Sequence, residues 1–272
     1  NHEHRDYVST VNLLGGTISD NAAKNGGGVS LMGCADTING TILTKNFAKE
    51  NGGGVYAATK VEWDYTDPTC YVSTMSLYSG TISHNIALKT GGGIFASGSD
   101  VTLSDIQVTG NTAIENGGGI IIVKLHDVCY QGYGHVYYDR NSELKVSGQL
   151  QIHTNSNGKN EPDNLYLQDG NTLEVTGSLA GSDIGIRNPL RGQFSVRGSY
   201  QLNPEDAKSF HADIGLDTAA VREDNTLVWK NSVIGSAVIG YNTFLYTDNP
   251  VSGVGSPFNG NAEYNKDTRT LI

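Results

Sequence analysis

Residues Gly16–Val29 read GTISDNAAKNGGGV, and the fold can be inferred from them because the chain repeats this phrase three more times. The other copies are GTILTKNFAKENGGGV from Gly40, GTISHNIALKTGGGI from Gly80 and DIQVTGNTAIENGGGI from Asp105. Such self-similarity is typical of a solenoid, in which each repeat buries its apolar face against the next. The intervals between glycine triplets are 26, 39 and 26 residues, because the triplets begin at Gly26, Gly52, Gly91 and Gly117.

Each repeat contains three short runs that read as strands, and their period predicts an all-β fold. Three strands and about 26 residues per turn indicate a single right-handed parallel β-helix of about six coils over residues 11–200. Each strand then pairs with its counterpart one turn on, roughly 4.8 Å away. The expected strands are Val11–Leu14, Gly16–Ser19, Gly28–Leu31; Asp36–Asn39, Gly40–Thr44, Gly54–Ala58; Met75–Tyr78, Gly80–Ser83, Gly93–Ser97; Val101–Ser104, Ile106–Thr109, Gly119–Val123; Glu143–Val146, Gln149–Ile152, Asn164–Leu167; Thr172–Val175, Asp183–Arg187, Gln193–Arg197.

Equivalent positions of the repeat predict ladders that run along the solenoid. The glycines allow positive φ and a close approach of successive coils. Asparagine tolerates the left-handed region and can bond the stacked neighbour's amide, so we expect it in a turn. The predicted ladders are aliphatic at Ile18, Ile42, Ile82 and Val108 and at Val29, Val55, Ile94 and Ile120; alanine at a bend at Ala23, Ala48, Ala87 and Ala113; and asparagine at Asn21, Asn46, Asn85 and Asn111.

Composition limits the classes of partner. The net charge of −10 and the pI near 5.0 oppose binding to a phosphate backbone, so we expect no nucleic-acid partner. No run of 18 apolar residues exists, and we expect no membrane insertion. The chain opens with Asn1 and has no initiator methionine, which favours a processed product or one module of a longer chain.

The repeated phrase resembles the β-helical repeats of bacterial adhesin-like surface proteins, in particular the polymorphic outer-membrane-protein repeat of autotransporter passengers. In this chain a third glycine replaces the alanine of the Gly-Gly-Ala-Ile element, and Phe47–Asn51 only approximates the Phe-x-x-Asn element. Residues 164–179 are similar to coils of large surface proteins of anaerobic bacteria. The resemblance covers roughly residues 11–230 and implies a bacterial, extracellular or cell-surface location. The resemblance predicts the architecture of the chain but does not predict an activity.

The chain changes in character after about residue 200. Asn203 and Pro204 read as the cap and first position of a short helix, Pro204–Phe210. Ala219–Val221 and Thr226–Trp229 read as a hairpin or last coil. We expect residues 1–10 to be a tail or cap, residues 201–230 to close the solenoid, and residues 231–272 to be an extended tail or the start of another module.

Two insertions interrupt the repeats, at residues 59–74 and 124–141. Both leave the coil after its third strand, so they should project from one side, two coils apart, with roots roughly 10 Å from each other. Insertions in solenoids gather on one face, which is often the binding face.

The insertions are rich in aromatic residues and carboxylates, which suit a sugar, because sugar CH groups stack on rings and hydroxyls bond acids. We therefore predict a glycan or another surface ligand as the partner. The competing interpretation is that the rings hold the two loops to each other and to the coils. The predicted ligand-binding residues are Trp63, Tyr65, Tyr71, Tyr130, Tyr133, Tyr137, Tyr138, His135 and Arg140.

Two other functions stay open. Acids on facing loops could serve a polysaccharide hydrolase or lyase, with Asp64, Asp67, Asp127 and Asp139 as the catalytic candidates. The motifs of pectin-type hydrolases are missing from the chain. The third alternative is a structural spacer of a large surface protein.

Metal and disulfide assignments remain weak at the level of sequence. His126 and His135 with Asp127 and Asp139 could converge on zinc, and Asp64 with Asp67 could help bind calcium, but neither spacing is diagnostic. We therefore assign no cofactor. A disulfide could join Cys70 to Cys34 or to Cys129, depending on geometry.

Overall fold

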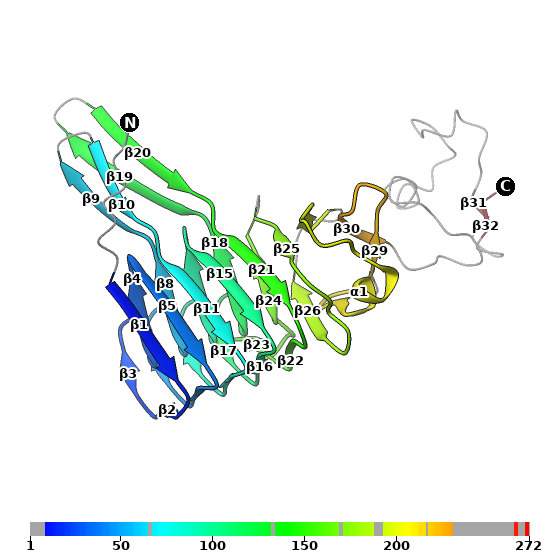
Figure 1. Cartoon of the computed structure of the whole chain (residues 1–272), viewed down its shortest axis with the longest axis horizontal. Coiled ribbons are helices and arrows are strands. Elements are labelled where there is room, and N and C mark those ends of the chain that lie inside the picture. Colours follow the sequence, from blue (N-terminus) through cyan, green and yellow to red (C-terminus); the bar gives the residue numbers. More distant parts are fainter. Residues whose placement is uncertain are drawn as a thin grey trace.

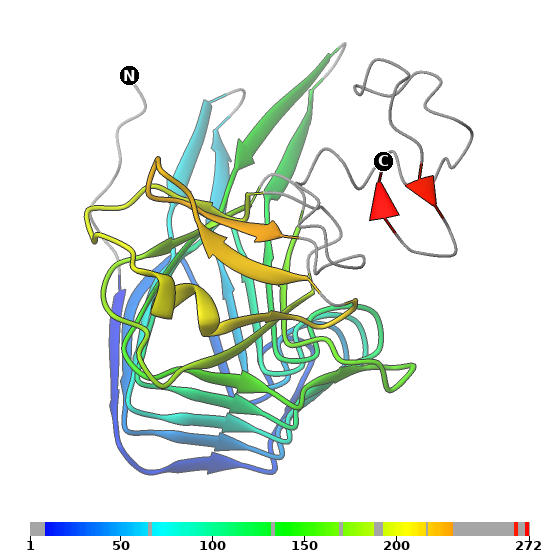
Figure 2. The same ribbon diagram turned by 90° about the vertical axis from the view of Figure 1, so that its right-hand side faces the viewer.

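The computed structural model is a parallel β-helix (Figure 1). It describes residues 9–64, 67–131, 134–168, 171–187, 193–215, 217–230, 264–265 and 270–271. Viewed along the stack of coils, successive strands lie over one another and enclose the interior (Figure 2). The predicted all-β solenoid is confirmed.

One wall is a seven-stranded parallel sheet, here called the front sheet. Its register is continuous: Leu13 pairs with Ile38, Ile38 with Leu77, and Leu77 with Leu103. In order, its strands are β1 (Ser9–Leu14), β5 (Cys34–Asn39), β11 (Thr74–Tyr78), β15 (Asp100–Ser104), β21 (Glu143–Ser147), β25 (Leu173–Val175) and β27 (Ser195–Val196).

The other strands form two more walls and a narrow sheet between them. The two walls join at β26 (Asp183–Arg187), which pairs with β22 through Ile184 and with β24 through Ile186. One wall has β2 (Thr17–Ser19), β6 (Ile42–Thr44), β12 (Thr81–Ser83), β16 (Gln107–Thr109) and β22 (Gln151–His153); the other has β4 (Val29–Met32), β8 (Val55–Ala58), β14 (Ile94–Ser97), β18 (Ile120–Val123) and β24 (Leu165–Leu167); the narrow sheet has β3 (Ala22–Ala23), β7 (Phe47–Ala48), β13 (Ile86–Ala87), β17 (Thr112–Ala113) and β23 (Ser156–Asn157).

The alanine ladder lies in this narrow sheet, where a bend was expected. Ala23, Ala48, Ala87 and Ala113 pair in register on two-residue strands, so a regular coil has four strands and not three. The expected third strand of the last coil, Gln193–Arg197, was also wrong. β27 pairs with β25 in the front sheet, because the long strand β26 already serves both other walls.

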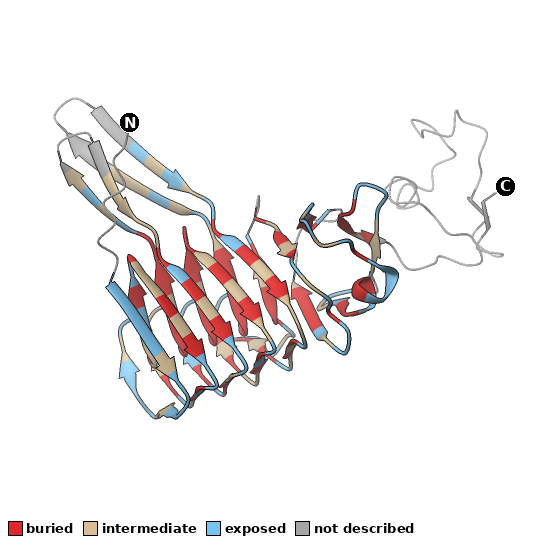
Figure 3. Ribbon diagram, in the orientation of Figure 1, coloured by how far each residue is buried: buried red, intermediate tan, exposed pale blue. Residues whose placement is uncertain are grey.

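Buried residues recur along the strands of the coils (Figure 3), and their apolar side chains form one core cluster. The ladder Val29–Val55–Ile94–Ile120 is confirmed by the register. In the other ladder the prediction of Ile42 was wrong: Leu43 lies between Ile18 and Ile82, whereas Ile42 is 43% exposed. The second copy of the repeat has one additional residue before its asparagine, so the interior position must be counted back from Asn46.

The asparagines form a hydrogen-bonded ladder. Oδ1 of Asn85 accepts from the backbone amide and from Nδ2 of Asn46, at 2.9 and 3.0 Å, and Asn111 does the same for Asn85. The ladder continues through Asn155 and Asn164, which the repeat pattern did not reveal. In the four copies of the repeat the positive φ falls on the residue before the asparagine and not on the asparagine itself, as at Lys45 (57°) and His84 (56°).

The glycine triplet combines two requirements. Its first member has positive φ, as at Gly91 (68°). Its third member is needed for space, because a Cβ atom on Gly93 would lie 2.5 Å from the carbonyl oxygen of Gly119 in the next coil. Coils can therefore stack at β-sheet distance only because the triplet has no side chains.

A small unit follows the last coil. Asn203 caps α1 (Pro204–Lys208), which ends two residues earlier than expected, and Asp206 completes the capping box. β28 (Phe210–Ala212) extends the wall at β26, and β29 (Thr218–Val221) pairs antiparallel with β30 (Leu227–Lys230). The Phe194 ring lies 5.3 Å from Phe210 and 4.6 Å from Trp229, between ring centroids, so aromatic rings close this end of the core.

Little of the remaining chain belongs to the described part. In the predicted tail, β31 (Tyr264–Asn265) pairs with β32 (Thr270–Leu271), and residues 231–263 lie outside the described residues. Among the described residues, no helix is long and apolar enough to cross a membrane.

Candidate functional site

Both insertions are antiparallel β-hairpins. The first hairpin consists of β9 (Lys60–Asp64) and β10 (Asp67–Tyr71), and the second of β19 (Leu125–Gln131) and β20 (Gly134–Arg140). They lead into β11 and β21, which are two strands apart in the front sheet. Figures 1 and 2 show them projecting side by side from the same side of the coils, as the insertion positions predicted.

The two hairpins contact each other through their facing sides. Trp63 Nε1 donates to a carboxylate oxygen of Asp127 at 3.2 Å. The Tyr138 hydroxyl hydrogen-bonds Cys70, and burial together with that thiol raises the pKa of Tyr138 to about 12. Trp63 and Tyr138 therefore hold the hairpins together, which is the competing interpretation of the aromatic residues.

The root of the second hairpin is anchored to the coils. Arg140 forms an ion pair with Asp100 at 2.7 Å and also donates to the Gly98 carbonyl. A Cβ atom on Gly98 would lie 2.6 Å from Cβ of Leu125, so the hairpin crosses this glycine at close range. The guanidinium of Arg140, predicted to contact a ligand, is engaged in these contacts with the coils.

The thiols do not pair as the sequence suggested. Cys34 and Cys70 are both free, and the Cys34 thiol donates to the Met32 carbonyl at 3.2 Å. The disulfide between Cys34 and Cys70 is therefore absent. The side chain of Cys129 lies outside the described residues.

The outer side of the second hairpin, here called the wall, carries an exposed aromatic and ionic cluster. The Tyr137 ring is 59% exposed and stacks on His126, with 5.5 Å between ring centroids. Asp139 accepts from Lys124 Nζ at 2.6 Å, and His126 Nδ1 lies 2.6 Å from its other oxygen. Lys124, and then His126, lower the pKa of Asp139, so this carboxylate stays ionised in mildly acidic solution.

Tyr71 lies on the other side of the hairpin pair. Its Cβ lies 2.7 Å from the position a Cβ on Gly33 would occupy, so it covers the first coil. Lys60 Nζ stands 5.8 Å from its ring centroid and pairs with Glu62 at 2.5 Å. The predicted aromatic residues thus belong to three separate surfaces.

Several predicted ligand residues cannot be placed. Backbone register pairs Tyr130 with His135, but their side chains lie outside the described residues. Tyr65 and Tyr133 lie wholly outside them.

The predicted catalytic carboxylates are not brought together where the structure describes them. Asp127 pairs in register with Tyr138 and Asp139 with His126, so Asp127 and Asp139 lie on opposite sides of one hairpin. Asp64 and Asp67 face each other in backbone register, and their side chains are not described. Within the described part of the chain, no three His, Cys, Asp or Glu side chains are placed to hold a metal ion.

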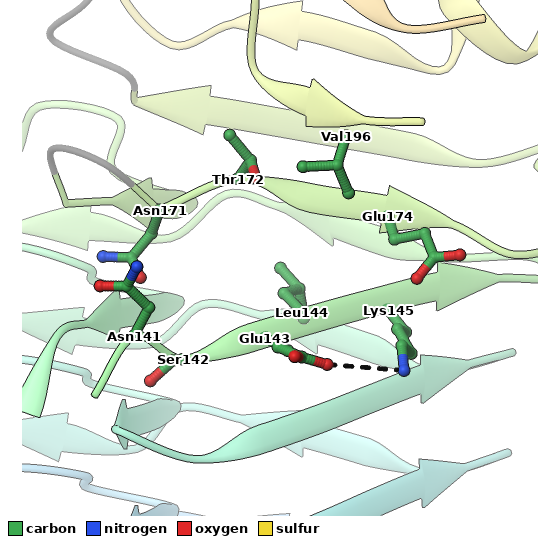
Figure 4. A pocket seen from close by; sticks show the side chains of 9 residues that line it. All are labelled: Asn141, Ser142, Glu143, Leu144, Lys145, Asn171, Thr172, Glu174 and Val196. Carbon is green, nitrogen blue, oxygen red and sulfur yellow. Dashed lines mark ion pairs between the residues drawn. The ribbon is translucent and has the colours of Figure 1, made fainter. Parts of the chain in front are cut away.

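A pocket that the sequence reasoning missed lies on the front sheet at the foot of the second hairpin (Figure 4). Its volume is about 310 Å³. The root of the hairpin connects to it, because the Lys124 amide donates to the side chain of Gln168, whose carbonyl accepts from the Asn171 amide. Its lining residues are Asn141, Ser142, Glu143, Leu144, Lys145, Asn171, Thr172, Glu174 and Val196.

The pocket places charged groups on the outer side of adjacent strands. Lys145 Nζ lies 3.6 Å from Glu143, and Lys145 is paired in register with Glu174 on the next strand. Alternation along the two expected strands could have put Glu143, Lys145 and Glu174 on one outward side. The position of Val196 in the pocket could not be predicted, because the sequence analysis did not place β27 in the front sheet.

Comparisons of the chain with models of protein families, with curated proteins and with solved structures gave no match. The resemblance to adhesin-like repeats therefore stays a prediction, and the functional argument rests on the geometry of the wall and the pocket.

Proposed function

We propose that this protein is a carbohydrate-binding module of a bacterial surface protein, and that the wall of the second hairpin is its glycan-binding surface. The observation that carries the proposal is the exposed ring of Tyr137, held against His126 beside the Lys124–Asp139 ion pair. An exposed ring offers a face to sugar CH groups, and the adjacent charged groups offer hydrogen bonds to hydroxyls.

Anchoring of the wall supports this assignment. The second hairpin is held from behind by Trp63 and Cys70 of the first hairpin and at its root by Asp100. Its outer side therefore needs little ordering on binding, and preorganisation increases affinity.

The test is retention of the protein on immobilised plant and mucin polysaccharides. Tyr137→Ala should weaken binding about tenfold or more, if a sugar ring stacked on Tyr137 contributes at least the lower end of the about 1–3 kcal/mol known for a nucleic-acid base on an aromatic ring. Tyr78→Ala is the matched control, because Tyr78 is also exposed (37%) but lies on β11 of the front sheet. It should bind like the wild type.

Other outcomes decide between the alternatives. Formation of new reducing ends or unsaturated uronates would show that the protein is a polysaccharide-active enzyme and not a binding module. If no immobilised glycan retains the protein, or if the Tyr137→Ala variant binds like the wild type, the wall is not a glycan-binding surface. Either result would favour the structural spacer.

A further inference from the structure

We infer that the pocket at the foot of the second hairpin is a second binding site, and that it takes a sugar unit without an acidic group, with an amino sugar preferred. The site is separate from the wall in its residues and in its chemistry. It rests on the proposed function only in the choice of sugars as the ligand class.

An unpartnered polar group points to a ligand. Asn171 is only 6% exposed and lines the pocket, yet its Oδ1 accepts no hydrogen bond from any described residue. Its Nδ2 donates to the Gln168 carbonyl at 3.2 Å, which fixes the amide plane. A buried acceptor without a donor costs about 1–3 kcal/mol, and because less than 1 Å² of Oδ1 is accessible, a ligand hydroxyl or ammonium recovers that free energy only if the Asn171 amide turns Oδ1 into the pocket.

The charges select against acidic ligands. Two carboxylates, Glu143 and Glu174, face one ammonium group, Lys145, and Lys145 is already paired with Glu143. The balance in the pocket is therefore one negative charge. A uronate or a sulfated sugar would meet like charge, whereas an ammonium or hydroxyl donor would meet acceptors.

The shape fits a small polar ring with one apolar side. A volume of about 310 Å³ is at the lower end of the range for small-molecule sites. Figure 4 shows the amides of Asn141 and Asn171 at one end, Glu174 and Lys145 at the other, and Val196 beside them. Val196 is 41% exposed and offers an apolar contact to sugar CH groups.

The position of the pocket also has a physical cause. Along the front sheet the strands shorten from five residues in β21 to three in β25 and two in β27. β25 supplies Glu174 as the register partner of Lys145 but has no partner for Glu143, at the start of β21. A hollow therefore forms where the coils taper toward α1 and its adjoining strands.

The test is calorimetric titration of the intact protein with three oligosaccharides of equal length: chitosan, cello-oligosaccharide and oligogalacturonate. We expect chitosan to bind best, the neutral oligosaccharide about tenfold more weakly, and oligogalacturonate not measurably. Glu174→Gln should weaken chitosan binding about tenfold and reduce the discrimination against oligogalacturonate. Glu205→Gln is the control, because Glu205 is an exposed carboxylate on α1 paired with Lys208, and it should change nothing.

The outcomes separate this inference from the proposed function. If Tyr137→Ala abolishes retention while Glu174→Gln titrates like the wild type, the wall stands and the pocket is refuted. If Glu174→Gln loses chitosan binding while Tyr137→Ala does not, the pocket stands and the wall falls. Tighter binding of oligogalacturonate than of chitosan would overturn the inference outright.

Discussion

Trp63 and Asp127 are 64 positions apart in the sequence, yet the indole Nε1 of one donates to the carboxylate of the other at 3.2 Å. This contact joins two insertions that left the solenoid two coils apart. It converts two hairpins, each marginal in stability on its own, into a paired projection with an inner and an outer side.

Replacing Trp63 by Phe should loosen this pair without unfolding the coils. The variant keeps an aromatic ring but removes the indole donor, so one oxygen of the half-buried Asp127 carboxylate loses its partner while the other still accepts from the Val128 amide. We expect faster hydrogen exchange at residues 60–71 and 125–140 and an unchanged unfolding midpoint of the coils. Tyr71→Phe, on the far side of the first hairpin, is the control, and equal exchange in both variants would contradict the pairing.

Replacing Asn85 by Ala should destabilise the whole solenoid. Asn85 is fully buried, accepts two hydrogen bonds from Asn46 and donates to Leu43 and Asn111. Leaving those groups unpaired should cost about 3 kcal/mol or more, at about 1–3 kcal/mol for each buried group. Denaturant unfolding measures the loss. Asn21→Ala, at the exposed end of the ladder, should cost about 1 kcal/mol or less, and equal costs at both positions would refute the ladder as a stabilising element.

Replacing Gly93 by Ala tests the close stacking of coils. The new Cβ atom would lie 2.5 Å from the carbonyl oxygen of Gly119 and 3.1 Å from Nδ2 of Asn111, and neither atom can move without parting the coils. We expect a loss of about 3 kcal/mol, the upper end for overpacking, or failure to fold. In Gly40→Ala the nearest atoms stand 4.0 Å away and only the positive φ of 64° opposes the change. Its cost should be about 1–2 kcal/mol, and thermal unfolding compares the two.

Asp163 should make the protein more stable in mild acid. Its side chain is fully buried, neither carboxylate oxygen has a hydrogen-bond partner among the described residues, and burial raises its pKa to about 6. The backbone amide of Gly117 and the positive charge of Arg187 lower the pKa of Asp163, whereas the negative charges of Asp213 and Glu161 raise it further. Because the folded state holds the proton more tightly than the unfolded state, this contribution is complete below about pH 4 and is lost as pH rises through about 6.

Asp163→Asn separates this effect from the other carboxylates. The variant removes the charge, so its free energy of unfolding should exceed that of the wild type at pH 7 and lose most of the decline between pH 4 and 6. Burial also raises the pKa of Asp213, which leaves a smaller decline in the same direction. Chemical denaturation at several pH values measures both, and a variant less stable than the wild type at pH 7 would contradict the assignment.

The repeating architecture could be predicted from the amino-acid sequence alone. Three glycines and an asparagine at a fixed spacing leave few alternatives, because stacked coils need a glycine wherever one backbone meets the next and an asparagine wherever a turn must bond its neighbour. Where the repeat was counted from Gly40, the interior position of Ile42 was wrong, since one additional residue in a turn exchanges inside and outside along a strand.

Which side chains of the insertions stay exposed depends on how the two hairpins pack against each other. Aromatic composition marked both insertions, but in a hairpin successive side chains point to opposite sides, and the side that becomes buried depends on the neighbouring hairpin. Trp63 and Tyr138 therefore became contacts between hairpins and Tyr137 stayed exposed. The pocket of Glu143, Glu174 and Val196 combines three successive coils, and such a hollow exists only once their register and the taper of the front sheet are known.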